Sequence, residues 1–491
     1  MLIAVKPEIN SYMAAVPEKL QMQHLAWRAG FGASLPVIEE WTHKKRRQVI
    51  SKILTGPDKD QQAPLKVMDE SDLPERTKQM SPEEKKELAK MNRQGIKDLN
   101  LSWIYEMVQS QHPLREKMAL FWHGHFACRT QNVLFSQQLL QVIRENALGN
   151  FGTLLTAVSR TPAMLQFLNN QQNYKAHPNE NFAREVMELF TMGRGYYTET
   201  DIKEAARAFT GWGYDNEGNF VFREKRHDYG NKTILGKTGN FTGDDILKIL
   251  LEQKETAKFI TEKIYRYFVD EVPDDARINT LAEKFYTSGY DIGALMQHIF
   301  NADWFYDQRL IGRRIKSPVE LLVGLRRTVP VNFEREAVML SFQQVLGQVL
   351  FYPPNVAGWP GGRSWIDSSS LMYRMQLPKM ILYEKEFNIT PKEITPEMGM
   401  GSYKATMQLN ETVKRQYARK IKGVINWDVF LKDYEKVPRE KLADTIAGSL
   451  LLANKNVSKQ LLENYADASS RETYIKTVAI AVMGTPEYQL C

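Results

Sequence analysis

Helix-start signals recur along this chain, and they constrain its fold more than any other feature. Ser81–Glu84 (SPEE) places a serine at the N-cap, a proline in the first turn and a glutamate at the third helical position. Ser317–Glu320 (SPVE) repeats the serine and the proline before an apolar run. We therefore predict a mainly α-helical protein, built as a multi-helix globular array.

One segment departs from this helical pattern and predicts a single small β-hairpin near residues 213–228. Gly213–Asn219 (GYDNEGN) supplies the turn residues, and Phe220–Phe222 leads out of the turn as a strand. The next stretch, residues 232–243, is dotted with glycine. We expect that stretch to be irregular.

The chain of 491 residues divides into three expected parts. Residues 1–390 form a mostly helical core that holds the hairpin and a loop at Pro353–Trp365 (PPNVAGWPGGRSW), where three prolines and three glycines exclude a regular element. Residues 391–410 are polar and form a loose linker. Residues 411–491 form a helical C-terminal region that packs on the core. Within the core, residues 17–55 are expected to form two helices.

The cysteine content gives no sign of a disulfide framework. Cys128 and Cys491 are the only two cysteines, and a bridge between them stays an open but disfavoured alternative. The absence of any CxxC pair also excludes a cysteine-rich zinc site.

Charge and hydropathy restrict the partners and the location. The net charge of +7 is modest, and the basic runs Lys44–Arg47 (KKRR) and Lys414–Lys422 (KRQYARKIK) are both short, which argues against nucleic-acid binding. No apolar run approaches the length of a membrane span. The apolar start at Met1–Val5 is too short for an export signal, which predicts a cytoplasmic protein, or an envelope or periplasmic one if the N-terminus was trimmed.

The first candidate site is the histidine pair His123 and His125 in the segment FWHGHFA. On a continuous helix the two rings would point about 200° apart and could hardly share a ligand. Gly124 between them suggests a break that would let both rings converge on a metal. The alternative is that one histidine lies in the core or caps a helix while the other is exposed.

The second candidate lies on the predicted helix at residues 179–192. Arg184, Glu185 and Glu188 share its polar face. The two glutamates would serve as an acid/base pair or as metal ligands, and Arg184 would neutralise a carboxylate or bind an anionic substrate. The alternative is an ordinary solvated face.

A third candidate, His227 with Asp228, directly follows the hairpin. An imidazole beside a carboxylate in a loop is able to bind a metal, although a dipeptide is weak support and a local turn would explain it equally well. Thr210–Trp212 (TGW) and the Pro353–Trp365 loop suit either a ligand-covering wall or packing between elements. No phosphate-binding P-loop, GxSxG or HExxH motif occurs.

Seven segments together resemble the bacterial family known as domain of unknown function 1800. They are His24–Gly32, Phe121–Ala127, Asn179–Gly193, Tyr197–Trp212, Arg226–Phe241, Lys316–Leu325 and Gly347–Ile366, and the closing Pro486–Cys491 is similar as well. The resemblance implies a helical protein without an assigned reaction. It also implies a protein partner or a shared pathway, because family genes commonly neighbour a second uncharacterised family, numbered 1501, that resembles alkaline-phosphatase-like hydrolases.

This sequence departs from the family's pattern at two positions. Many relatives have histidine where Phe190 stands, so an imidazole there is dispensable. Many have asparagine in the place of Gly124, so that residue carries no required chemistry. Many relatives also begin with export signals that this chain lacks.

Two functions stay open. The first is a metal-assisted enzyme, a hydrolase or an oxygenase, with a divalent metal held by His123, His125, His227 and Asp228, and with Glu185, Glu188 and Arg184 as catalytic residues. The second is a non-catalytic helical partner or scaffold that works with the family-1501 protein. A common meeting point for the histidines and carboxylates would favour the enzyme.

Overall fold

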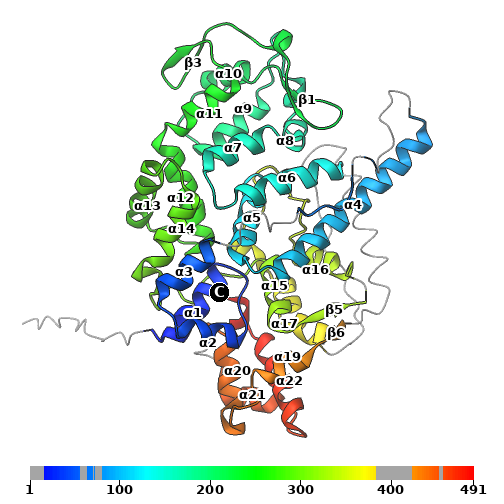
Figure 1. The fold of residues 1–491 in the computed structure, drawn as a ribbon, viewed down its shortest axis with the longest axis vertical. Helices are drawn as coiled ribbons and strands as arrows, with labels where there is room; N and C mark the ends of the chain where they lie inside the picture. The colour runs from blue at the N-terminus through cyan, green and yellow to red at the C-terminus, as the bar shows by residue number, and fades with distance from the viewer. Residues whose placement is uncertain are drawn as a thin grey trace, which may run out of the picture.

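The computed structural model describes residues 16–55, 64–69, 71, 80–334, 336–382, 423–452 and 457–491. Across these ranges the chain is a mainly helical array drawn out along one axis, which confirms the predicted fold class (Figure 1). The expected linker at 391–410 lies outside the described residues.

The helices predicted at Ser81, at Ser317 and from residue 179 begin within a few residues of these positions, and helices form most of the described chain. In chain order they are α1 (Glu18–Arg28), α2 (Leu35–Thr42), α3 (Arg46–Thr55), α4 (Pro82–Gln109), α5 (Pro113–His125), α6 (Val133–Asn146), α7 (Phe151–Ser159), α8 (Pro162–Phe167), α9 (Asn181–Glu185), the π-helix η4 (Val186–Thr191), α10 (Glu199–Ala208), α11 (Gly243–Leu251), α12 (Lys254–Phe268), α13 (Asp275–Thr287), α14 (Ile292–Asn301), α15 (Pro318–Thr328), α16 (Val338–Leu346), α17 (Ser368–Leu382), α19 (Trp427–Lys432), α20 (Leu442–Leu450), α21 (Lys459–Tyr465) and α22 (Arg471–Met483).

The two helix-start signals act as the sequence indicates. In α4 the Ser81 hydroxyl accepts the Glu84 backbone N–H, and the Glu84 carboxylate accepts the Ser81 N–H in return. In α15 the same exchange links Ser317 and Glu320. Each capping box satisfies two backbone donors that the first helical turn leaves without partners.

Three two-stranded antiparallel sheets occur within the described ranges. The predicted hairpin is β1 (Trp212–Tyr214) with β2 (Phe220–Phe222), and the other pairs are β3 (Lys232–Ile234) with β4 (Lys237–Gly239), and β5 (Val331–Phe333) with β6 (Gly423–Ile425). The stretch 232–243 is thus partly a second hairpin rather than irregular. The segment expected to hold two helices, 17–55, holds three, since the chain turns again at His43–Lys45.

The elements surround one extensive apolar core whose buried members come from α1 through α22. Figure 1 shows α7–α11 and the first two hairpins at one end, α19–α22 at the other, and α5 in the middle. Helix α5 packs against α3, α4 and α6, and α12 packs against the π-helix. The histidine segment on α5 and the π-helix that carries Glu188 are therefore each packed against other helices of the array.

Two further expectations concern cysteines and membranes. Cys128 and Cys491 are both buried and both carry free thiols. Among the residues that the structure describes, no helix combines the length and the apolar character needed to cross a bilayer.

Candidate functional site

Helix α5 runs unbroken through Gly124 and ends at His125, so the prediction of a break at Gly124 is wrong. A continuous helix turns the rings of His123 and His125 to different sides. The Nε2 atom of His123 accepts the backbone N–H of Phe351 at 3.1 Å, and its ring packs 5.2 Å from that of Trp103. Burial lowers the pKa of His123 to about 3, so this imidazole is neutral.

His125 contacts a different set of groups. Its Nδ1 lies 3.1 Å from the Lys263 ammonium, which can only donate, so Nδ1 accepts and Nε2 carries the proton. That Nε2–H points to the Phe190 carbonyl oxygen at 3.2 Å. Burial, and then the Lys263 charge, hold the pKa of His125 well below its usual range. The ring of Phe190, in the position where many relatives have histidine, lies 6.0 Å away.

The Leu189 and Phe190 carbonyls are available because they lie in the last turn of the π-helix, where carbonyl groups have no partner within the helix. Its wider turns alter the regular backbone ladder over Val186–Thr191. The Leu189 carbonyl accepts from Lys263 at 3.1 Å, next to the Phe190 carbonyl that His125 contacts. Burial lowers the pKa of Lys263 to about 8. Lys263 and His125 thus join α5, the π-helix and α12 at one junction.

The Pro353–Trp365 loop closes onto this junction through glycine. Gly358 has φ +79°, and a Cβ atom there would lie 2.3 Å from the Gly124 carbonyl oxygen. Only glycine permits this approach without strain. Trp359 follows and places its ring 5.8 Å from that of His123. The loop and the histidine segment are therefore packed directly on each other.

The carboxylates of the 179–192 segment form a separate cluster. Glu188 accepts from the Tyr197 hydroxyl at 2.8 Å and pairs with Arg194; although burial opposes it, these two bonds lower the pKa of Glu188. Burial, and then the charge of Glu188, raise the pKa of Glu185. Arg184 is held by Glu199 in a two-bond pair at 2.8 and 2.7 Å. This cluster resembles an ion-pair network on a half-buried helix face.

His227 and Asp228 are adjacent but act apart. The Nδ1 of His227 lies 2.9 Å from the Thr210 carbonyl oxygen, and its Nε2 is buried without a hydrogen-bond partner. Asp228 instead accepts two bonds from Arg207, at 2.7 and 3.2 Å, and this pairing leads the causes that lower the pKa of Asp228. The carboxylate therefore ties the loop after the hairpin to α10.

The predicted residues consequently fall into distinct clusters. Glu185 lies by Glu188, and His125 contacts a carbonyl of the π-helix. The residues of the predicted metal set, however, each bond to partners of their own. Across the described ranges, no group of three or more His, Cys, Asp or Glu side chains is arranged to hold a metal ion.

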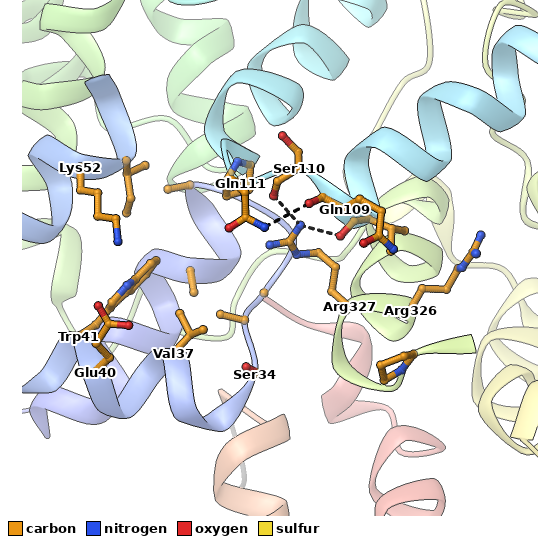
Figure 2. A pocket seen from close by; sticks show the side chains of 18 of the residues that line it. Ser34, Val37, Glu40, Trp41, Lys52, Gln109, Ser110, Gln111, Arg326 and Arg327 are labelled. Carbon is orange, nitrogen blue, oxygen red and sulfur yellow. Dashed lines mark hydrogen bonds between the residues drawn. The ribbon is translucent and has the colours of Figure 1, made fainter. Parts of the chain in front are cut away.

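A cleft of about 480 Å³ lies elsewhere, between α1–α3, the end of α4 and the end of α15. Its walls include the half-buried Trp41 and Val37 and the exposed Lys52 on one side. Figure 2 shows Arg327 reaching across from α15 toward Ser110 and Gln111 on the opposite side. A cavity of this size suits a small ligand or a single inserted side chain.

Of the two terminal nitrogens of the Arg327 guanidinium, only Nη1 is hydrogen-bonded to described residues. Its Nη1 donates to the carbonyls of Met107, Val108 and Ser110 at 3.1, 2.9 and 3.2 Å, which completes the C-terminal end of α4. Its Nη2 makes no hydrogen bond to a described residue, and its Nε is buried without a partner. Burial lowers the pKa of Arg327, but a guanidinium stays charged in a protein.

The neighbouring charges of the cleft are mostly matched. Arg326 forms a two-bond pair with Glu336, at 2.9 and 3.1 Å, and Glu40 pairs with Lys44. Lys52 has no ion pair with a described residue. The cleft was not predicted from the sequence. The signal that pointed to it is the pair Arg326 and Arg327 in the last turn of α15, since basic side chains near a helix end often bond carbonyl groups.

Fold and site together define a class: a mainly helical protein with tightly interlocked motif segments and one mixed polar and apolar cleft. The model of the family described as "Protein of unknown function (DUF1800)" matches residues 24–490, and the chain belongs to that family. No curated protein and no solved structure matches it.

Proposed function

We propose that this protein is a non-catalytic helical binding protein that docks a partner at the cleft beside Trp41 and Arg327. The observation that carries the proposal is unmet bonding capacity: Nη2 of Arg327 makes no hydrogen bond to a described residue, and no described carboxylate forms an ion pair with Lys52. Trp41 adds an aromatic wall. Ligand sites combine an apolar lining with a few such polar groups.

The state of the motif residues supports a binding role over a catalytic one. His123 and His125 spend their ring nitrogens on a backbone N–H, a backbone carbonyl and Lys263. Gly358 packs on Gly124. These contacts lock segments together, which is what a rigid scaffold needs. The partner to which the family resemblance points is the phosphatase-like family-1501 protein encoded beside such chains.

Co-purification with that defined partner tests the proposal. The two proteins are co-expressed, this chain carries the tag, and the affinity is then measured with the separated proteins. Trp41→Ala removes the aromatic wall and should weaken binding by at least about tenfold, as for a central interface aromatic. Tyr105→Ala is the matched control, because Tyr105 is 54% exposed on α4 and does not line the cleft. No complex with the wild type, or equal affinity for Trp41→Ala, would contradict the proposal.

A metal-assisted enzyme is the second candidate, and one observation favours it. His227 donates Nδ1–H to a backbone carbonyl and leaves Nε2 without a partner, which is the arrangement that orients a ligating imidazole. The test is elemental analysis of protein purified without a chelating tag, beside His227→Ala. Near-stoichiometric Zn, Fe or Mn that is lost in the variant would support the enzyme; folded wild-type protein without metal would end this candidate.

A further inference from the structure

We propose that the cleft recognises a carboxylate carried on an apolar group, with Arg327 and Lys52 binding the anion and Trp41 covering the apolar part. The inference deepens the proposed binding function and rests on it. Two sources share this chemistry: a free small organic acid and the C-terminal residue of a peptide.

The lining of the cleft carries more positive than negative charge. The charged residues that line the cleft are Lys52, Arg326, Arg327 and Glu40. Arg326 is neutralised by Glu336, and Glu40 is paired with Lys44 outside the cleft. The excess positive charge is therefore that of Arg327 and Lys52, and the nearby Glu40 carboxylate offsets part of the Lys52 charge.

Arg327 is prepared for an anion by the way it is fixed. Three carbonyl oxygens at the end of α4 hold Nη1, so the guanidinium plane is oriented before a ligand arrives. Ordering the side chain in advance lowers the entropic cost of binding. The carbonyls are dipoles rather than full charges, so they offset the cation only in part. The two N–H bonds of Nη2 are left to meet a carboxylate oxygen, which is a charge-assisted contact.

The opposite side of the cleft is apolar. Trp41 and Val37 come from α2, and Val49 and Ile53 come from α3, with Lys52 at the end of that helix. Figure 2 shows Trp41 and Lys52 facing Arg327 across the space. A ligand that fills about 480 Å³ thus meets cations and apolar carbon together. Inorganic phosphate has the negative charge without the apolar group, and a neutral amide of the acid has the apolar group without the charge.

Isothermal titration calorimetry with 3-phenylpropionate tests the proposal on the full chain. We expect binding in the sub-millimolar range, and at least about tenfold weaker binding for 3-phenylpropanamide and for inorganic phosphate, because each lacks half of the recognised chemistry. A phenylalanine-ended peptide with a free or an amidated C-terminus forms the second arm. Preference for the free-ended peptide assigns the peptide source, and binding of the small acid alone assigns the free acid.

Variants locate the binding in the cleft. Arg327→Gln should weaken the binding of 3-phenylpropionate by about tenfold. Lys52→Gln should weaken it by about threefold, because Lys52 is exposed and its charge is screened by solvent. Arg327→Gln also loses a helix cap, so Lys52→Gln, which removes no hydrogen bond to a described residue, keeps the test valid if the first variant unfolds. Lys45→Gln is the control, because Lys45 is exposed, carries the same charge and lies outside the cleft lining.

Two results would overturn the inference: equal binding of acid and amide, or unchanged binding in Lys52→Gln and folded Arg327→Gln. If no acid binds while the family-1501 protein still binds in a Trp41-dependent way, the carboxylate specificity fails and the proposed function stands. If neither binds, both fail.

Discussion

Glu320 is a buried carboxylate at the centre of a group of buried charges, and removing its charge should lower the stability of the fold. Its carboxylate accepts the Ser317 N–H at 2.7 Å and pairs with both Lys117 and Arg314, and these three ionic side chains are 0%, 0% and 6% exposed. The substitution Glu320→Gln keeps the shape and removes the charge. Lys117 and Arg314 then lose this carboxylate and keep, among the described residues, only the negative charge at Cys491. Breaking a buried ion pair in this way costs about 3–5 kcal/mol.

The expected thermal shift follows from the size of the chain. Unfolding entropies of about 2 cal/mol/K per residue give roughly 1 kcal/mol/K for 491 residues, so Glu320→Gln should lower the melting temperature by about 3–5 °C in scanning calorimetry. Glu283→Gln is the control, since the Glu283–Lys254 pair is 57% and 64% exposed and should change the temperature by less than about 0.5 °C.

A second variant tests whether the lost charge is the cause. Adding Lys117→Met to Glu320→Gln removes one stranded cation, so the double variant should be more stable than the two single effects added together. A drop below about 1 °C for Glu320→Gln, or strict additivity in the double variant, would refute the argument that uncompensated buried charge sets the cost.

Three further outcomes follow from the site. Burial lowers the pKa of Lys263 to about 8, so with rising pH the folded state loses this proton before the unfolded state does. The stability of the wild type relative to Lys263→Met should therefore rise between about pH 8 and pH 10.5, as melting curves across that range would measure. Gly358→Ala, at φ +79° and against the Gly124 carbonyl, should cost at least about 2 kcal/mol, whereas Gly124→Ala meets no atom within 4 Å and should be tolerated, in paired denaturation curves. Asp228→Asn weakens the pair with Arg207 and should cost about 2 kcal/mol near pH 7 but less below the lowered pKa of Asp228, where the wild type is also protonated.

Local signals predicted the helices well because capping is local chemistry. Ser81 and Ser317 mark the starts of α4 and α15 through partners only three residues away. The second hairpin escaped prediction because its turn uses Leu235 at φ 49° before Gly236, and a leucine rarely adopts a positive φ. The sequence offered no asparagine or second glycine to announce such a turn.

The parts of the site that depend on distant contacts could not be predicted. The π-helix has an ordinary amphipathic sequence, and its carbonyls meet Lys263 and His125 from other helices. The cleft joins segments near Trp41, Ser110 and Arg327 that lie far apart in the chain. Periodicity and motif spacing report only on neighbours along the sequence, so neither could bring these residues together.

Residue type alone directed attention to histidines and carboxylates, whereas a bound ligand needs groups whose bonding capacity is unmet. Asp228 has two bonds from Arg207, and His125 has a partner at each ring nitrogen, so a ligand would have to displace existing bonds. Displacing a buried charged partner costs more than a new contact of the same kind returns. Arg327 presents the opposite case: its fixed end positions it, and its Nη2 makes no hydrogen bond to a described residue, so a ligand would displace only solvent there. For this reason the cleft, rather than the histidine motif, is the stronger place to look for binding.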